Sequence, residues 1–405
     1  MRALQLQNAI ASGIADHTLS PEALDRAVSS VLRAKFALGL FDHPYTDPSL
    51  TPRVKRSQEH LQLSLESARQ SLTLLKNDRH LLPLSKNLKR IAVIGPNAAI
   101  ARYGDYEDEK NGQRISIADG LRALLPQAQL TVDDGSDLQA AVGHARSAEA
   151  VIMALGEYQG ISGESFDRQS LDLPGNQEAL LEKVAATGKP VVLVLENGRP
   201  LTIGWAAEHI PAILEAWYPG EFGGQAVAEV LFGDRNPSGK LTITFPRSIG
   251  QLPAFYNFDP SKTTKYVDGD RTPLFPFGFG LSYTSFRYGN LAVKTPGPGS
   301  NAGVIVSVDV TNTGTLEGDE IAELYLHHDV SSVEVPDRTL QGFSRVHLKP
   351  GETKTVVFNL ERSQLAVWNT KHEWMVERGP YTVFAGSSSQ ADLLAGFTMP
   401  ETRKP

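Results

Sequence analysis

One segment of this 405-residue sequence combines acidic, basic and aromatic side chains in a pattern suited to acid–base chemistry. It connects an apolar run at 151–155 to a helix pattern that begins near residue 176. Its ionisable and aromatic residues are Glu157, Tyr158, Glu164, Asp167 and Arg168. Connections between a strand and a helix usually take about 2 to 6 residues, and longer ones are often functional. Three glycines in the segment allow the backbone to bring a carboxyl group toward a ligand. The same composition also fits a solvated surface loop, and the residues alone leave both interpretations open.

The elements around this loop predict where it lies. From about residue 57, short apolar runs alternate with helical patterns, which is typical of an α/β layered domain with a mainly parallel sheet. Strands are predicted at 72–75, 91–94, 130–132, 151–155, 191–195 and 213–216, and helices at 137–148, 177–186 and 225–232. The runs at 151–155 and 191–195 are apolar throughout, as expected for strands buried on both faces. Ligands of parallel sheets bind beyond the carboxyl ends of the strands, which is where the loop after 151–155 begins.

The last third of the chain has a different period. Val304, Val306, Val308 and Val310 alternate with other residues, and turn signals such as Pro350-Gly351 separate further runs. This pattern predicts an antiparallel, all-β sandwich of the immunoglobulin-like type.

The points at which the sequence pattern changes predict four regions. The first forty residues predict two helices, the second starting at Ser20-Pro21, where Ser caps and Pro occupies the first position. The apolar residues on one face of these helices need another part of a protein to pack against. The expected regions are 1–54 (two helices and a linker), 55–250 (the α/β domain), 251–285 (a linker) and 286–402 (the sandwich).

Composition excludes several classes of function. The formal net charge of -7 and the absence of any basic block argue against a nucleic-acid partner. With no cysteine, disulfides and thiolate chemistry are excluded. The residues after Met1 lack the apolar core of a signal peptide, and no stretch is long and apolar enough to span a bilayer, so no membrane partner is expected. The compartment is left open.

Several motifs, in order along the chain, resemble glycoside hydrolase family 3. The α/β motifs are Ser162-Gly163-Glu164-Ser165, Asp167-Arg168, 171–177, Asn197-Gly198-Arg199-Pro200, 217–224, 233–241 and 275–283. In the sandwich, 338–343 and Gly386-Ser387-Ser388 resemble the family's fibronectin type III-like domain. The resemblance covers nearly the whole chain and implies a β-glucosidase-like or β-xylosidase-like protein.

The resemblance also implies roles for the loop residues. Glu164 matches the general acid of a retaining glycosidase, which later acts as the base. Glu157, seven residues earlier, is the runner-up, although a surface acid at a strand end is the favoured interpretation of it. Asp167 and Arg168 are expected to pair and brace the loop. Either of them, or Tyr158, is a candidate contact to the sugar.

The family's nucleophile is an Asp on a (β/α)8 barrel that precedes these domains, and no Ser-Asp-Trp-like segment occurs here. The first 45 residues resemble only the barrel's last helical segment. No nucleophile is therefore assigned in this chain, and a barrel on a separate chain or a homo-oligomer partner is one way to supply it. A second hypothesis is a non-catalytic carbohydrate-binding or interaction module that uses the loop and aromatics such as Trp217. Hydrolysis by a substitute carboxylate is the third.

The resemblance bears on substrate and cofactor as well. Gly104-Asp105-Tyr106 resembles a piece found in β-xylosidase and arabinosidase-like members and in glucosidases. The expected ligand is a β-linked oligosaccharide or aryl glycoside, cleaved from its end. Two carboxyl groups and water suffice for this reaction, so no metal and no organic cofactor are implied. Family members are often periplasmic or secreted.

Overall fold

A computed structural model describes residues 2–104, 106, 112, 114–158, 160–258, 265–297, 299 and 302–405. The chain divides into two compact units, residues 1–61 and 62–405. Asp105 of the Gly104-Asp105-Tyr106 motif and Gln159 of the acidic loop lie outside the described residues. Over the described part of the chain, the helices are too short or too polar to traverse a lipid bilayer.

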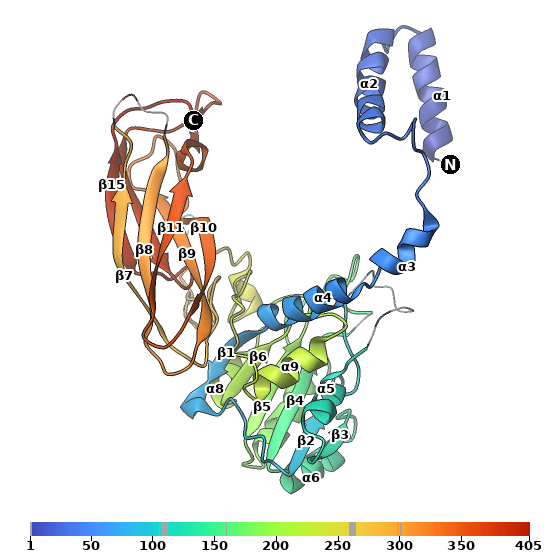
Figure 1. The fold of residues 1–405 in the computed structure, drawn as a ribbon, viewed down its shortest axis with the longest axis vertical. Coiled ribbons are helices and arrows are strands. Elements are labelled where there is room, and N and C mark those ends of the chain that lie inside the picture. Colours follow the sequence, from blue (N-terminus) through green and yellow to red (C-terminus); the bar gives the residue numbers. More distant parts are fainter. Residues whose placement is uncertain are drawn as a thin grey trace. The chain divides into compact units, whose positions relative to one another are not determined.

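The first unit contains the two predicted helices. They are α1 (Arg2–Ala15) and α2 (Pro21–Ala37), followed by η1 (Pro48–Leu50), α3 (Thr51–Val54) and the start of α4 (Gln58–Ser71). Helices α1 and α2 lie side by side (Figure 1). The Ser20 side chain accepts a hydrogen bond from the Ala23 backbone N–H at 3.2 Å, which confirms the predicted cap. Helix α2 has no buried residue, and its Phe36 side chain is 66% exposed.

The second unit begins with a six-stranded sheet. Its strands are β1 (Thr73–Asn77), β2 (Arg90–Ile94), β3 (Gln129–Asp133), β4 (Ala150–Gly156), β5 (Val191–Glu196) and β6 (Ala212–Glu215). The spatial order is β1-β6-β5-β4-β2-β3, and all pairs are parallel except β1 with β6. The predicted mainly parallel sheet is confirmed. Every residue of β4 and β5 is buried, because helices cover both faces of the sheet.

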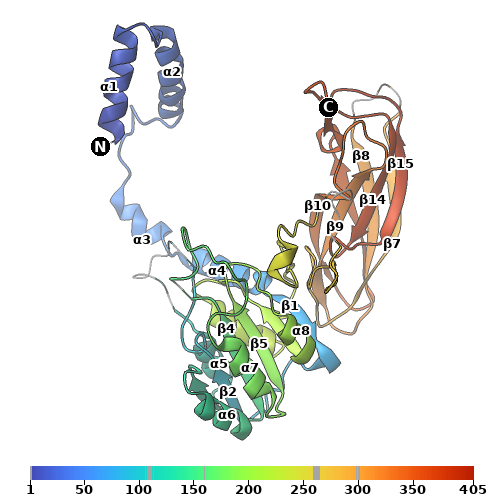
Figure 2. The same cartoon turned by 180° about the vertical axis from the view of Figure 1, so that it is seen from behind.

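Helices form a layer on each face of this sheet (Figures 1 and 2). The helices are α4, α5 (Ile117–Leu124), α6 (Leu138–Ser147), α7 (Gln177–Ala185), α8 (Gly204–His209) and α9 (Gly223–Leu231). Side chains of α4, α5 and α9 share one apolar core with the sheet, and side chains of α6, α7 and α8 share the other. Helices α4, α5 and α8 were not among the sequence predictions.

The sandwich contains two antiparallel sheets. Its strands are β7 (Phe286–Lys294), β8 (Val304–Asn312), β9 (Gly318–His328), β10 (Thr339–Leu348), β11 (Thr353–Leu360), β12 (Val367–Trp368), β13 (Trp374–Met375), β14 (Gly379–Gly386) and β15 (Leu393–Met399). The sheet orders are β10-β9-β14-β15 and β11-β8-β7, with β12 and β13 paired separately. The alternating valines of β8 are fully buried, which confirms the predicted period of two.

The segment between the sheet and the sandwich is tied to both of them. Phe245 and Phe275 form an isolated bridge and pack in the apolar core of the α/β domain, and Leu281 pairs with Leu74 of β1. Toward the sandwich, the Ser389 N–H donates to the Phe277 carbonyl at 2.9 Å. The segment predicted as a linker therefore contributes side chains to a hydrophobic core.

Helices α5 and α9 approach so closely that two glycines are required. A Cβ at Gly224 would lie 1.9 Å from the Ser116 carbonyl oxygen, and one at Gly120 would lie 2.0 Å from the Gly224 carbonyl oxygen. Both obstacles are backbone atoms, so a side chain at either position would force the helices apart.

We therefore expect Gly224→Ala to destabilise the α/β domain by about 2–3 kcal/mol, because the crossing must open. Gly143→Ala on α6 is the matched control, since no atom lies within 4 Å of the added Cβ. That control should gain up to about 1 kcal/mol from helix propensity. Thermal unfolding of the two variants measures the difference, and equal melting temperatures would contradict the close crossing.

Candidate active site

The acidic loop leaves the sheet at the carboxyl end of β4. The side chain of Gln177, the first residue of α7, fixes this point. Its Nε2 donates to the Gly156 carbonyl at 2.9 Å, and its Oε1 accepts from the Gly156 N–H at 2.8 Å. Gly156 has φ +131°, and a Cβ there would lie 2.1 Å from the Glu196 carbonyl oxygen of β5. The loop start is thus fixed against the neighbouring strand and the following helix.

Glu157 lies completely buried directly after β4. Its Oε1 accepts from Arg168 Nη1 at 2.8 Å and from Arg199 Nε at 3.0 Å, and its Oε2 accepts from the Gly198 N–H at 3.1 Å. Hydrogen bonds between charged partners are among the strongest in proteins. The interpretation of Glu157 as a surface acid is therefore wrong. The expected pairing of Asp167 with Arg168 is also wrong, because Arg168 donates to Glu157 and to the Asp172 carbonyl instead.

Arg199 links this buried carboxylate to the rest of the loop. Its Nη2 donates to the Ile161 carbonyl at 3.1 Å and to the Phe166 carbonyl at 3.2 Å. These two carbonyls stand on either side of Glu164. We name Glu157, Arg168 and Arg199 the loop clamp, because their hydrogen bonds hold the chain on both sides of Glu164.

Glu164 lies at the tip of the loop, between the two carbonyls that Arg199 holds. Gly163 precedes it with φ +151°, and Ser165 follows it with φ +68°, so the chain turns sharply at this point. The side chains of Glu164 and Asp167 are exposed, and Tyr158 is 42% exposed. The structure therefore brings Glu157 and Arg168 together beneath the loop, and it leaves Glu164, Asp167 and Tyr158 on its surface.

Two further buried carboxyl groups lie at the same edge of the sheet. Glu196 ends β5 and Glu215 ends β6, and both are almost inaccessible to solvent. Burial raises the pKa of each to about 8, and Arg102 partly opposes the rise at Glu196. Glu215 accepts hydrogen bonds from the Trp217 N–H at 2.8 Å and from Asn197 at 3.2 Å. A Glu directly after an apolar strand run was the sequence signal for both, and it was overlooked.

The chemistry of this edge follows from its exposure pattern. Buried carboxyls with a raised pKa are neutral at neutral pH and contribute polarity without charge. Glu164 is the carboxyl that reaches the surface at the loop tip. Among the described residues, no cluster of three or more His, Asp or Glu side chains is arranged to hold a metal ion. The arrangement can deliver a carboxyl group to a ligand that approaches the carboxyl edge of the sheet.

Comparison with known families agrees with the fold. The model of the glycosyl hydrolase family 3 C-terminal domain matches residues 72–283, and that of the fibronectin type III-like domain matches residues 320–389. The chain belongs to glycosyl hydrolase family 3. The predictions of the family and of both fold classes are confirmed.

Relatives with curated names include glycosidases of two kinds. A β-xylosidase of Formosa agariphila is 42% identical over 392 residues, which cover 92% of this chain and 54% of that protein. A periplasmic β-glucosidase of Salmonella typhimurium is 37% identical over 414 residues, covering 90% of this chain and 54% of that protein. The chain thus spans about half the length of the curated relatives it matches.

Solved structures give the same result. A β-glucosidase from Erythrobacter marinus superposes with a TM-score of 0.91 at 36% identity, covering 96% of this chain and 57% of that one. A β-glucosidase from Listeria innocua in complex with glucose gives 0.87 at 31% identity, covering 96% of this chain and 56% of that one. At these identities the likeness extends beyond the fold to the family.

The loop clamp predicts a local effect of removing Arg199. Arg199→Ala leaves Glu157 with one guanidinium and leaves the Ile161 and Phe166 carbonyls without their donor, so we expect a loss of about 3 kcal/mol. Hydrogen exchange of residues 160–167 should accelerate. Arg122→Ala is the control, because it breaks an exposed pair with Asp119 and should cost less than about 1 kcal/mol. Unchanged exchange in the loop would show that Arg199 does not order it.

The two buried acids predict a pH dependence of stability. In the folded chain Glu196 and Glu215 keep their protons up to about pH 8, whereas in the unfolded chain they lose them near pH 4.5. The unfolded state therefore binds fewer protons between these values, and stability falls as pH rises, by up to about 1.4 kcal/mol per pH unit for each group. Melting temperatures of the wild type and Glu215→Gln from pH 5 to 9 test this. The variant should show a shallower decline, and parallel curves would contradict the assignment.

Proposed function

We propose that this chain is the acid/base-bearing part of a retaining, exo-acting β-glycosidase, with Glu164 as the group that protonates the departing glycosidic oxygen and later takes a proton from water. The observation that carries the proposal is the loop clamp. A buried carboxylate and two arginines fix a loop whose exposed tip residue is the carboxyl that the family motif implies. Fixing the loop orders the donor before the substrate arrives, which lowers the entropic cost of the proton transfer.

The second carboxyl of such a mechanism must come from elsewhere. Retaining glycosidases place nucleophile and acid about 5–5.5 Å apart. Glu157, the runner-up acid, accepts hydrogen bonds on both oxygens within the loop clamp and is not available to attack a sugar. We therefore assign Glu157 as a positioning residue and expect the nucleophile on a barrel, within a longer chain, on a separate chain or from a second copy.

The substrate class follows from the relatives. The named relatives are a β-xylosidase and β-glucosidases, so we propose a terminal β-glucosyl or β-xylosyl residue of an oligosaccharide or aryl glycoside as the substrate. Asp167, Arg168 and Tyr158 were the candidate sugar contacts. Of these, the exposed Asp167 and Tyr158 remain candidates, whereas the guanidinium of Arg168 is engaged by Glu157 and the Asp172 carbonyl. The proposed chemistry uses carboxyl groups and water and calls for no cofactor.

The role of Glu164 predicts a dependence on the leaving group. We expect Glu164→Ala, assayed with the 405-residue chain mixed with a family 3 barrel, to lower hydrolysis of a poor leaving group such as methyl β-glucoside by about 10²–10⁴-fold. A dinitrophenyl glycoside should lose much less in its first step, because its leaving group needs no proton. Azide should restore turnover of the variant and yield a glycosyl azide.

The control variant is Glu208→Gln, which removes an exposed acid at the end of α8 and should leave all rates unchanged. Equal losses for good and poor leaving groups, or turnover that survives Glu164→Ala, would show that another group donates the proton. Saccharide binding by the mixture without any turnover would favour the non-catalytic carbohydrate-binding module.

A further inference from the structure

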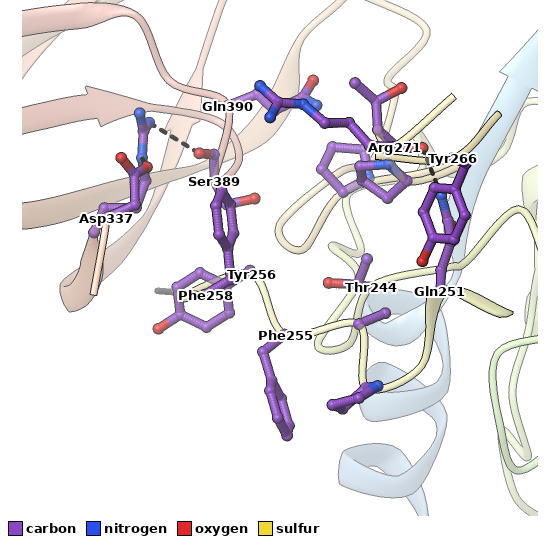
Figure 3. A pocket seen from close by; sticks show the side chains of 16 residues that line it. Thr244, Gln251, Phe255, Tyr256, Phe258, Tyr266, Arg271, Asp337, Ser389 and Gln390 are labelled. Carbon is purple, nitrogen blue, oxygen red and sulfur yellow. Dashed lines mark hydrogen bonds and ion pairs between the residues drawn. The ribbon is translucent and has the colours of Figure 1, made fainter. Parts of the chain in front are cut away.

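A cavity of about 510 Å³ opens between the connecting segment and the sandwich. Its lining comes from three places: Thr244 near the end of the α/β domain, residues within 251–258 and 266–276 of the connecting segment (251–285), and the sandwich loops that carry Asp337 and Gln390 (Figure 3). The volume lies within the range of about 300–1,000 Å³ that is typical of small-molecule sites. No described residue of the Glu164 loop lines it.

The walls of this cavity are held by specific contacts. The Asp337 N–H donates to the Phe258 carbonyl at 3.0 Å, and the Tyr256 hydroxyl accepts from the Leu340 N–H at 3.1 Å. The Tyr256 ring stacks on Phe277 with centroids 4.3 Å apart. Tyr266 donates its hydroxyl to the Gly250 carbonyl at 2.8 Å on the opposite wall. The cavity is therefore preformed, because backbone bonds and stacked rings join its two sides.

Two aromatic rings at the cavity are left exposed. Phe255 is 66% exposed and Phe258 is 46% exposed, although nearby aromatic side chains are packed. In Figure 3 Phe258 lies beside Tyr256, and the Phe255 ring points away from the other labelled side chains. Exposed rings beside a cavity provide flat apolar surface that a ligand can cover. The C–H face of a pyranose ring is a ligand surface of matching shape.

The polar groups of the cavity have unused hydrogen-bonding capacity. Thr244 is only 8% exposed, lines the cavity, and its hydroxyl has no partner among the described residues. A hydroxyl in a cavity wall can both donate to and accept from a ligand. The side chains of Arg271 and Gln390 likewise make no hydrogen bond or ion pair within the described part of the chain.

Among the described residues, the charged side chains that line the cavity are two arginines, Arg271 and Arg338, and one aspartate, Asp337. Arg271 contributes a cation, and the half-exposed Asp337 contributes an anion whose Oδ2 pairs with Arg338. A cationic ligand would meet both arginines, and an anionic ligand would meet the Asp337 carboxylate. A neutral polyol can instead donate to Asp337 and accept from Arg271, Gln390 and Thr244 at once.

We propose that this cavity is a saccharide-binding site for a neutral mono- or disaccharide, in which Phe255 and Phe258 contact the sugar face and Thr244, Arg271 and Asp337 bind its hydroxyls. The site goes beyond the proposed acid/base function and does not require it. It gives the chain a means of holding a saccharide that is independent of Glu164.

Calorimetric or saturation-transfer titration of the 405-residue chain with cellobiose and with xylobiose tests the site. We expect saturable binding with a Kd in the range of about 1–10 mM, as is ordinary for a small polar ligand. The double variant Phe255→Ala/Phe258→Ala and the near-isosteric Thr244→Val should each weaken binding by at least about tenfold. Thr244→Val keeps the shape of the side chain, so its effect separates hydrogen bonding from folding.

Two controls complete the experiment. Phe343→Ala removes a 71% exposed ring of the sandwich and should leave Kd unchanged. Glu164→Gln should also leave Kd unchanged, since the cavity does not include the loop. The proposal is overturned by the absence of saturable binding to the wild type, by equal Kd values in the cavity variants, or by binding that depends on Glu164 alone. The leaving-group experiment is unaffected by any of these results, so the two proposals fail independently.

Discussion

The buried carboxylate of Glu157 accepts hydrogen bonds from two guanidiniums and one backbone N–H, and the order of the acidic loop depends on these bonds. Burying a carboxylate without partners costs several kcal/mol, so the site can exist only if its cations stay in place. Because Arg199 also holds two carbonyls on either side of Glu164, that requirement is passed on to the loop backbone. The backbone on both sides of the tip residue therefore has a defined position.

The cost of burying the three strand-end glutamates is offset in two different ways. Glu157 follows β4 and is paired with arginines, whereas Glu196 on β5 and Glu215 on β6 retain a proton, as their raised pKa values of about 8 indicate. Three neighbouring carboxylates would repel one another in a dry environment. Keeping two of them neutral allows polar groups to line the sheet edge while concentrating negative charge on one member and on the exposed loop.

Much of the fold could be predicted from the sequence, because apolar runs and their period report burial directly. The buried strands β4 and β5 and the alternating valines of β8 were predicted for that reason. Helix α8 was missed because six residues are too few to show a helical period. Helix α5 was overlooked although its sequence is strongly amphipathic and begins with a capping box between Ser116 and Asp119. The antiparallel direction of β1 depends on tertiary pairing with β6, which no local pattern encodes.

The candidate site could likewise be predicted only in part from the sequence. The identity of the loop and of Glu164 follows from local motif residues. The partner of Arg168 does not, because the choice between the adjacent Asp167 and the more distant Glu157 is decided by which carboxylate is buried. Arg199 contacts Glu157 across 42 positions of sequence, and only the parallel pairing of β4 and β5 brings them together.

The exposed tip of the acidic loop has a consequence for how the protein can change over time. Since the loop clamp lies beneath the turn, the side chains of Glu164, Ser165 and Phe166 contribute little to the buried core. Substitutions of these exposed side chains remove little buried surface, so selection at these positions acts mainly through chemistry. Glu157 and Arg199 are constrained by stability instead, because a substitution at either one leaves a buried charge or carbonyl without its partner.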